Sequence, residues 1–468
     1  MSLPGDHLSR YNDNPSLCPV VNNFVMSEPA QLVRALGRWS LAALMLNTVI
    51  GASIYGLPSL LAGYLGALSP LGYVLTGLGI ATIAVCLAEV SSQFEQAGGP
   101  YLYARAAFGS FAAIQIGWLT WLTRVVACAA GVNLFLSYLG QFLPPVENGF
   151  LRVTAGGVLV AILACVNYVG VTAGLRVNNF FAFTKILALL VFVVCGLVIL
   201  MAHPTARVPV QTVPITTASW FSAVLLMIYS FAGFEAALFV SGEIRNPRKD
   251  APVALLIALL GVTVLYVAVQ YVVIHTLPLA SASSKPVADS ARHFLGPVGA
   301  SLIAIGALIS AFGYLSANML HTPRLTFAMA EQGDFPAFFS TIHPRYRTPS
   351  VSIVVFAALV AVFSAAGSFQ SNATLAAVSR IFVYASIAAA LPILRRRNPR
   401  ADAFRVPGAM LFVVTALVFT GALVFAIPRN GIAFLLLTFC LAFLNWVWSR
   451  RRLPEFKHNQ NRASQRPS

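Results

Sequence analysis

Stretches of about 20 or more apolar residues recur from one end of this chain to the other, and each is long enough to cross the hydrocarbon core of a bilayer. Only 9% of the 468 residues are charged, whereas about a quarter are charged in a typical soluble domain. Strands that cross a membrane would instead alternate apolar and polar residues in pieces of about ten. The sequence therefore predicts an all-α integral membrane protein that crosses the bilayer many times.

Twelve apolar segments have the length of a membrane-spanning helix. They cover residues 39–65, 69–94, 110–140, 151–169, 177–201, 219–242, 251–277, 299–330, 350–366, 372–394, 408–427 and 430–449. Of the Lys and Arg residues, 22 lie on the side that holds both termini and five lie on the opposite side. Because cytoplasmic loops carry the excess of positive charge, both termini are expected in the cytoplasm, beneath a plasma or inner membrane. The same rule accounts for the net charge of +16, so no nucleic-acid partner is expected.

Two of the twelve segments contain helix-weakening residues at a similar depth. Gly51 follows Trp39 by 12 residues in the first segment, and Gly233 follows Trp220 by 13 residues in the sixth. An offset of five spans means that the two helices would run in opposite directions. Matching interruptions of this kind indicate inverted repeats with a binding site near the bilayer midplane. Close helix packing is the alternative explanation for either glycine taken alone.

Irregular backbone at the midplane is tolerated where it lines a cavity. N–H groups at the start of the half-helix after a break can hold an anion, and carbonyls at the end of the half-helix before it can hold a cation. The two breaks therefore predict a site for a zwitterion. The candidate substrate-binding residues are Ile50, Gly51, Ala52, Ser53, Ile54, Ser230, Phe231, Ala232 and Gly233. Phe231, inside the sixth segment's break, is the candidate gate over the substrate.

Four sequence elements resemble the signatures of the amino acid–polyamine–organocation (APC) superfamily. They are GASIYGLP at 51–58; AEV at 88–90 with EQAGGPYLY at 95–103; SFAGFE at 230–235 with GEIRNPR at 242–248; and PRL at 323–325 with AEQGDFP at 330–336. Two positions depart from the family pattern. Ser53 stands where a second glycine is usual, and Glu95 stands where proline is common. The extra Cβ and hydroxyl of Ser53 lie where the substrate backbone would bind.

This resemblance implies a leucine-transporter type of fold with helices one and six broken at the midplane. Inverted repeats of five helices would occupy residues 39–201 and 219–394, and two further helices 408–449. The tails would be residues 1–38 and 450–468, both cytoplasmic. The family implies a secondary active transporter, or permease, that moves an amino acid or a related amine by alternating access. Side chains of the third, eighth and tenth helices would shape the rest of the substrate pocket.

Charged residues inside apolar spans are costly unless they are paired or hydrated, so each is a functional candidate. Lys185 lies where sodium-independent relatives keep a lysine and sodium-coupled relatives bind an ion, which implies sodium-independent, proton-coupled transport. A fixed structural charge at Lys185, and exchange without proton coupling, are the alternatives. Glu235 is expected either to lock the sixth helix to a neighbour or to face the pocket. One of Arg124 and Arg380 is expected to pair with Glu235 or Glu89, or to lie near the pocket and favour a carboxylate.

Other classes of protein fit the sequence less well. A membrane-embedded transferase would need a polar catalytic cluster, and none is evident, so no enzymatic activity is expected. A nutrient sensor on the same fold would be expected to carry an extended effector domain, and a major-facilitator transporter would repeat its helices in sixes. Neither a phosphate-binding loop nor a His or Cys cluster occurs in the sequence, so no ATP, metal or other cofactor is expected.

Overall fold

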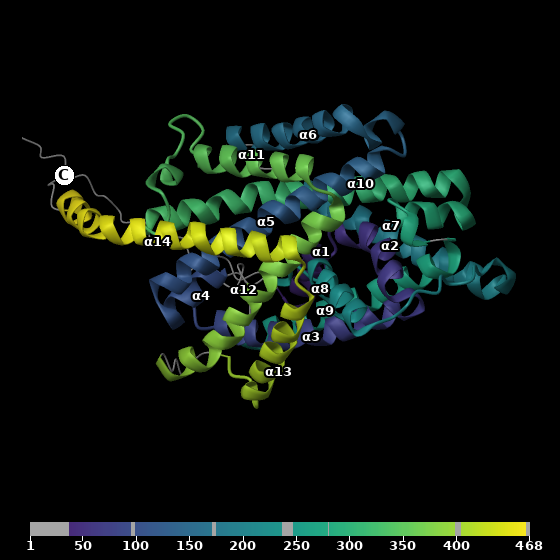
Figure 1. The fold of residues 1–468 in the computed structure, drawn as a ribbon, viewed down its shortest axis with the longest axis horizontal. Coiled ribbons are helices and arrows are strands. Elements are labelled where there is room, and N and C mark those ends of the chain that lie inside the picture. Colours follow the sequence, from purple (N-terminus) through teal and green to yellow (C-terminus); the bar gives the residue numbers. More distant parts are fainter. Residues whose placement is uncertain are drawn as a thin grey trace, which may run out of the picture. The chain divides into compact units, whose positions relative to one another are not determined.

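The computed structural model describes residues 37–94, 99–170, 175–235, 247–278, 280–397 and 404–464. Helices account for most of these residues, and no strand occurs within these ranges. All of them belong to one unit, Arg34–Ser468, in which the long helices lie side by side (Figure 1). The all-helical fold class is therefore as predicted.

Fourteen α-helices make up the described part of the chain. They are α1 (Arg38–Val49), α2 (Ser53–Leu65), α3 (Ser69–Ser91), α4 (Gly99–Phe108), α5 (Ser110–Leu139), α6 (Gly149–Val169), α7 (Leu175–Ala202), α8 (Thr217–Ser230), α9 (Pro247–Thr276), α10 (Pro286–Glu331), α11 (Ser350–Ala366), α12 (Phe369–Arg397), α13 (Ala409–Ala422) and α14 (Arg429–Ser464). Every one of the twelve predicted spans is at least partly helical. Within the described ranges, nine helical segments are long and apolar enough to cross a membrane, and α8 and α11 are shorter apolar helices. Twelve crossings, the inverted repeats and the domain boundaries stay predictions.

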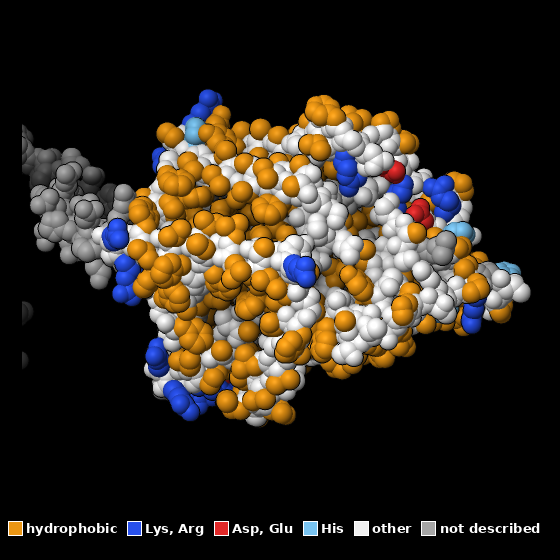
Figure 2. Space-filling model, viewed as in Figure 1, with side chains coloured by type: hydrophobic (Ala, Val, Ile, Leu, Met, Phe, Trp, Pro, Cys, Tyr) orange, Lys and Arg blue, Asp and Glu red, His pale blue; other side chains and the backbone are white. Residues whose placement is uncertain are grey.

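Large apolar side chains cover the outer surface of the helices. Phe150 at the start of α6 is 85% exposed, and Leu411 on α13 is 70% exposed. Figure 2 shows hydrophobic side chains over the middle of one face, with most Lys and Arg gathered towards its two ends. Extensive apolar surface of this kind is unfavourable in water but suits contact with lipid. The surface therefore agrees with an integral membrane protein.

Two helical segments occur where the sequence predicted loops. Helix α4 lies between the second and third predicted spans, and buries Tyr101 and Tyr103. Helix α10 begins 13 residues before the predicted span, at Pro286. Its first part ends at a sharp bend at Gly296, which has φ 68° and is followed by Pro297. Glycine adopts positive φ without a Cβ clash, and proline fixes φ for the start of a helix.

The centre of the bundle is built from α1, α2, α8 and the long helices around them. Helix α12 packs on α5, α10 packs on α5 and α7, and α9 packs on both α1 and α3. The short helix α2 contacts α8, α9 and α10. Because α1 and α8 both end inside this group of helices, their final carbonyl groups are directed into the protein interior.

Candidate functional site

The first predicted helix break is present in the structure, and the helix of the sixth span ends where its break was predicted. Helix α1 ends at Val49, Ile50 leaves the helical conformation with ψ 86°, and α2 begins at Ser53. Helix α8 ends at Ser230, and a turn follows that contains Gly233 with φ 113°. The expected second half of this interrupted helix, residues 236–242, lies outside the described residues. The helical conformation ends in both places close to a glycine, Gly51 or Gly233, which is a weak helix former.

The two breaks are in direct contact. A Cβ placed on Gly233 would lie 2.5 Å from the Thr48 carbonyl oxygen and 2.9 Å from its carbon. Such separations are far below van der Waals contact, so only glycine permits this approach. The positive φ of Gly233 is a second reason for glycine here. Gly233 thus brings the turn after α8 against the last residues of α1.

Hydroxyl groups from two other helices bind the free carbonyls of these breaks. The Tyr266 hydroxyl on α9 lies 3.1 Å from the Val49 carbonyl oxygen and 3.2 Å from the Ser230 carbonyl oxygen, so one donor serves both breaks. The Ser310 hydroxyl on α10 donates to the Gly51 carbonyl at 3.2 Å. Carbonyls at a helix end lack intrahelical partners and need such donors when buried.

Lys185 reaches the first break from α7. Its ammonium group donates a hydrogen bond to the Asn47 carbonyl near the end of α1, and the residue is 9% exposed. The Lys185 backbone carbonyl accepts a hydrogen bond from the Tyr55 hydroxyl of α2 at 3.3 Å. Lys185 therefore contacts both half-helices that flank the first break, and its positive charge lies at the negative end of the α1 dipole.

The remaining candidate substrate-binding residues line the breaks and are almost all buried. Ile50, Ala52 and Ile54 are at most 2% exposed, and Ser53, at 4%, lies beside Tyr266. Ala232 is partly exposed. The Ser230 hydroxyl donates to the Met227 carbonyl of its own helix.

Phe231, the candidate gate, is fully buried in this structure. Its ring packs against Tyr266 and Tyr73, with ring centroids 5.7 Å and 6.4 Å away. Tyr73 and Tyr266 also pack edge to face on each other, at 5.5 Å. The three rings form an aromatic cluster next to the point where Tyr266 joins the two breaks.

The charged candidates fall into two groups. Near the breaks, the Glu235 carboxylate accepts a hydrogen bond from the Gly233 backbone N–H at 3.0 Å. Arg124 donates a hydrogen bond to the side-chain oxygen of Asn318 at 3.1 Å. Arg380 is 6% exposed and shares its surroundings with Glu235. Neither arginine forms an ion pair with a described acidic residue.

Glu89 does not pair with Arg124 or Arg380, which corrects the expectation for this residue. Arg395, at the end of α12, holds the Glu89 carboxylate through both Nε and Nη2, the latter at 2.7 Å. The Val406 amide donates to the same carboxylate at 2.9 Å. Glu89 lies near the end of α3, so the arginine that can reach it comes from the end of another helix.

Residues of the family-like segment at 330–336 form a separate polar cluster. Arg105 of α4 lies 2.6 Å from the Asp334 carboxylate, and Tyr101 of the same helix donates to that carboxylate. Arg105 also donates to the Gln332 side chain at 2.7 Å. Burial raises the pKa of Asp334, although the Tyr101 hydrogen bond and the Arg105 charge act in the opposite direction. This cluster ties α4 to the end of α10 and shares no residue with the helix breaks.

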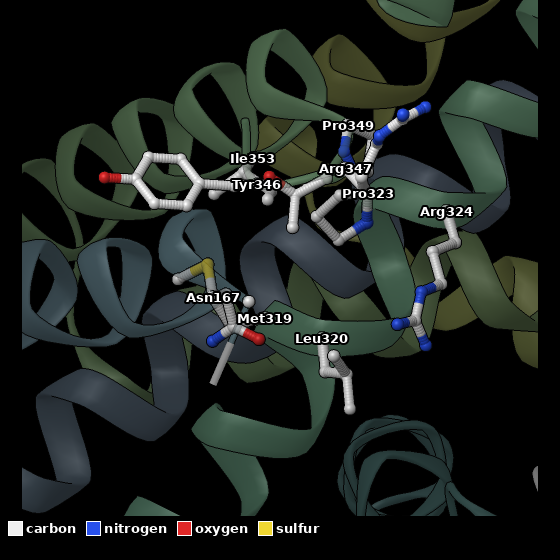
Figure 3. Close-up of a pocket in the computed structure, with 11 residues that line it drawn as sticks. Asn167, Met319, Leu320, Pro323, Arg324, Tyr346, Arg347, Pro349 and Ile353 are labelled. Carbon is white, nitrogen blue, oxygen red and sulfur yellow. The ribbon is translucent and has the colours of Figure 1, made fainter. Parts of the chain in front are cut away.

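A cavity of about 190 Å³ lies elsewhere, between the ends of α6 and α10 and the start of α11. Figure 3 shows Tyr346, Met319 and Asn167 around it, with the charged ends of Arg324 and Arg347 directed away from its centre. None of the residues that line it belongs to either helix break. The candidate binding site is therefore not this cavity.

Sequence reasoning missed Tyr266 and Gln270, which the structure places at the centre. Gln270 is fully buried, and its amide donates to the Pro58 carbonyl at 3.1 Å and to the Ser69 hydroxyl at 2.9 Å. The available signal was their spacing, because polar residues four apart in an apolar span face the same side of a helix. Their partners could not be predicted from this spacing, because Val49, Pro58 and Ser69 lie more than 200 residues away in the chain.

The end of α1 and the turn after α8 lie in contact at two of the family-like elements of the chain. A comparison with protein families gives a match to the amino acid permease model over residues 36–446. The chain belongs to the amino acid permease family. This places it in the APC superfamily, as the four sequence elements indicated, and makes it a multi-pass membrane protein.

Curated relatives match most of this permease. A methylthioribose transporter of Bacillus subtilis is 28% identical over 83% of this chain and 87% of its own length. The branched-chain amino acid permease BcaP of the same organism is 27% identical with the same coverage. The serine/threonine exchanger SteT, also from Bacillus subtilis, is 26% identical over 70% of this chain and 75% of its own. All three carry names of transport proteins, so a transporter is indicated and an enzyme is not.

Proposed function

We propose that this permease is a secondary active transporter that carries an amino acid or a related amine across the plasma or inner membrane by alternating access. The observation that carries the proposal is the contact between the two helix breaks, where Gly233 meets the Thr48 carbonyl. Two unwound segments packed together at the centre of a helical bundle place free backbone groups of both signs in one small volume.

The backbone at the first break supplies a site for each charge of a zwitterion. The first two N–H groups of α2, those of Ser53 and Ile54, have no acceptor within their own helix and form the positive end of its dipole, which suits a carboxylate. The carbonyls that end α1 and α8 suit an ammonium group. Gly51 lies between these two sets and leaves room for the substrate backbone.

Lys185 supplies the coupling in this proposal. Its ammonium donates to the Asn47 carbonyl, so it already holds a cation against the end of α1. A sodium ion at the same carbonyl would be repelled by this charge, which supports sodium-independent transport. A lysine in an apolar environment can also give up its proton when water is excluded. Release and uptake of that proton as the site changes sides would couple transport to a proton gradient.

The alternating movement has a physical basis in the shared hydroxyl of Tyr266. Because this group binds the Val49 and Ser230 carbonyls together, movement of one break disturbs the other. Phe231, packed on Tyr266, would move with them and act as the gate over the substrate. A substrate can drive such a change only through different affinities for the two states.

Exchange without proton coupling is the second candidate. The relative SteT is named as an exchanger, and the hydrogen bond from Lys185 to Asn47 is equally compatible with a permanently charged lysine. In that case Lys185 stabilises the first break in every state, and a counter-substrate returns the carrier. Both candidates place the termini on the cytoplasmic side, in keeping with the distribution of Lys and Arg.

Reconstituted uptake tests the proposal. Purified permease in proteoliposomes is supplied with each of the common amino acids in radioactive form, with sodium or potassium outside, and with an imposed pH gradient or none. We expect uptake of at least one amino acid without sodium, increased by an inward proton gradient. Uptake that needs only a second amino acid inside the vesicle would favour the exchanger. Strict dependence on sodium would contradict both candidates.

A further inference from the structure

A buried arginine, one of whose nitrogen atoms has no hydrogen-bond partner among the described residues, lies beside the proposed substrate site. Arg380 of α12 is 6% exposed, and its Nη1 atom has no hydrogen-bond partner among the described residues. It also forms no ion pair in that part of the chain. Burying an unsatisfied charged donor is costly, so such a group is kept only where something else binds it or where it has a function.

Arg380 belongs to a cluster of polar side chains from four helices and from the turn after α8. Its electrostatic neighbours are Tyr229 at the end of α8, Glu235 after the second break, Tyr314 on α10 and Tyr384 on its own helix. Arg124 of α5 acts on Tyr314 and Tyr384 as well, and so extends the same cluster. Among these side chains two are cationic and one is anionic, which leaves an excess of one positive charge.

Glu235 does not remove this excess by forming a close pair. Its carboxylate accepts the backbone amide of Gly233, and no ion pair joins it to either arginine within the described residues. Arg124 is held by the neutral side chain of Asn318. The charge of Arg380 is therefore available to a ligand that enters the cluster.

The cluster adjoins the helix breaks directly. A Cβ on Gly51 would lie 3.4 Å from the Tyr314 ring, and Glu235 is bound to Gly233. A zwitterion whose backbone is held at the first break would thus direct its side chain past Tyr314 towards Arg380. The chemistry of the cluster then decides which side chains are accepted.

Resting on the proposed transport function, we propose that Arg380 selects substrates whose side chain carries a hydrogen-bond acceptor: the carboxylate of an acidic amino acid or the carbonyl of its amide. Nη1 of Arg380 donates to that oxygen, and Arg124 adds to the positive field. A cationic side chain is rejected because it would bring like charge against Arg380, and an apolar one is disfavoured because it leaves the guanidinium unsatisfied.

Equilibrium binding to the purified wild-type protein tests this inference. The probes are L-glutamate, L-glutamine, L-methionine and L-lysine, which have side chains of similar length, followed by the other common amino acids. We expect glutamate or glutamine to bind at least about tenfold more tightly than methionine and lysine, the size typical of one hydrogen bond to a charged group. Lysine binding as tightly as glutamine overturns the inference.

Two substitutions at Arg380 and one control complete the test. Arg380→Met should reduce the preference for glutamate or glutamine over methionine to about threefold or less. Arg380→Lys should keep most of this preference, because the positive charge is retained. Arg429→Met removes an exposed arginine at the start of α14 and should leave the order of probes unchanged. An unchanged preference in folded Arg380→Met overturns the inference. If Arg380→Met does not fold, the relative affinities of the wild-type protein for the four probes decide whether the inference stands.

The test also separates this inference from the function on which it rests. Tight binding of only apolar or cationic amino acids overturns the role of Arg380 and leaves amino acid transport standing. Binding of none of the common amino acids overturns both the role of Arg380 and the transport of common amino acids.

Discussion

Gly233 lies against the carbonyl group of Thr48, so closely that a Cβ on the glycine would be 2.5 Å from the carbonyl oxygen. The two residues are 185 positions apart in the chain: Thr48 lies in the last turn of α1, next to the first break, and Gly233 lies in the turn after α8. Their contact shows that the breaks are not two separate irregularities of long helices. They form one structural unit, in which the shape of each depends on the other.

Replacement of Gly233 by alanine tests this unit. The new methyl group would clash with Thr48 and would have to adopt φ 113°, so we expect a loss of about 3 kcal/mol of stability from the two effects together. Thermal unfolding of the purified variant and its uptake of substrate measure the outcome. Gly157→Ala is the control, because a Cβ on that residue of α6 meets no atom within 4 Å. Similar unfolding temperatures for both variants would contradict the structural role of Gly233.

The sequence alone was sufficient to locate the breaks, because their cause is local. Gly51 and Gly233 each weaken a helix where they stand, and their positions after Trp39 and Trp220 can be counted. The lysine in an apolar span was visible for the same reason. Burial of an uncompensated charge is rare enough that Lys185 stands out without any structure.

The partners of these residues could not be predicted, because they depend on packing between distant helices. The Asn47 carbonyl that binds Lys185 has no side-chain signature, and 138 positions separate the two residues. Glu89 illustrates the same limit. Its partner proved to be Arg395, one of three consecutive arginines at the end of α12, and only the arrangement of the helices selects between them and Arg380.

Gly51→Leu is expected to abolish substrate binding while the protein still folds and inserts. A Cβ at this position is in ordinary contact with the Tyr314 ring at 3.4 Å, so the start of a side chain can be accommodated. The rest of the leucine would fill the space between the backbone groups of α1 and α2 where a carboxylate is proposed to bind. Binding should be measured on monodisperse protein, with Gly51→Ala as the smaller step. Wild-type affinity in Gly51→Leu would remove this residue from the site.

Ser53→Gly is expected to broaden the range of accepted substrates. Ser53 is 4% exposed at the first position of α2 and lies beside Tyr266, so its Cβ and hydroxyl narrow the proposed site. Competition by small and bulky amino acids against a transported substrate would show the change. The same order of competitors in both proteins would mean that Ser53 does not select substrates.

Tyr266→Phe is expected to slow transport several-fold with only a small loss of stability. The substitution keeps the ring that packs on Tyr73 and Phe231 but removes the hydroxyl shared by the two breaks, a change of about 1 kcal/mol. Tyr271→Phe on the same helix is the control, because its hydroxyl makes no hydrogen bond within the described residues. If both variants transport equally fast, the shared hydroxyl does not link the two breaks.

Lys185 distinguishes proton coupling from a fixed structural charge. If its proton is exchanged during the cycle, wild-type uptake should need no sodium and should rise as the external pH falls. Lys185→Met, which cannot carry a proton, should then transport at a rate independent of pH. Lys185→Arg decides between the models, because arginine keeps the charge beside the Asn47 carbonyl but does not release its proton. Under proton coupling Lys185→Arg should lose the pH dependence as Lys185→Met does. Under the structural model it should recover both stability and the wild-type pH profile, whereas Lys185→Met should lose stability and activity together at every pH.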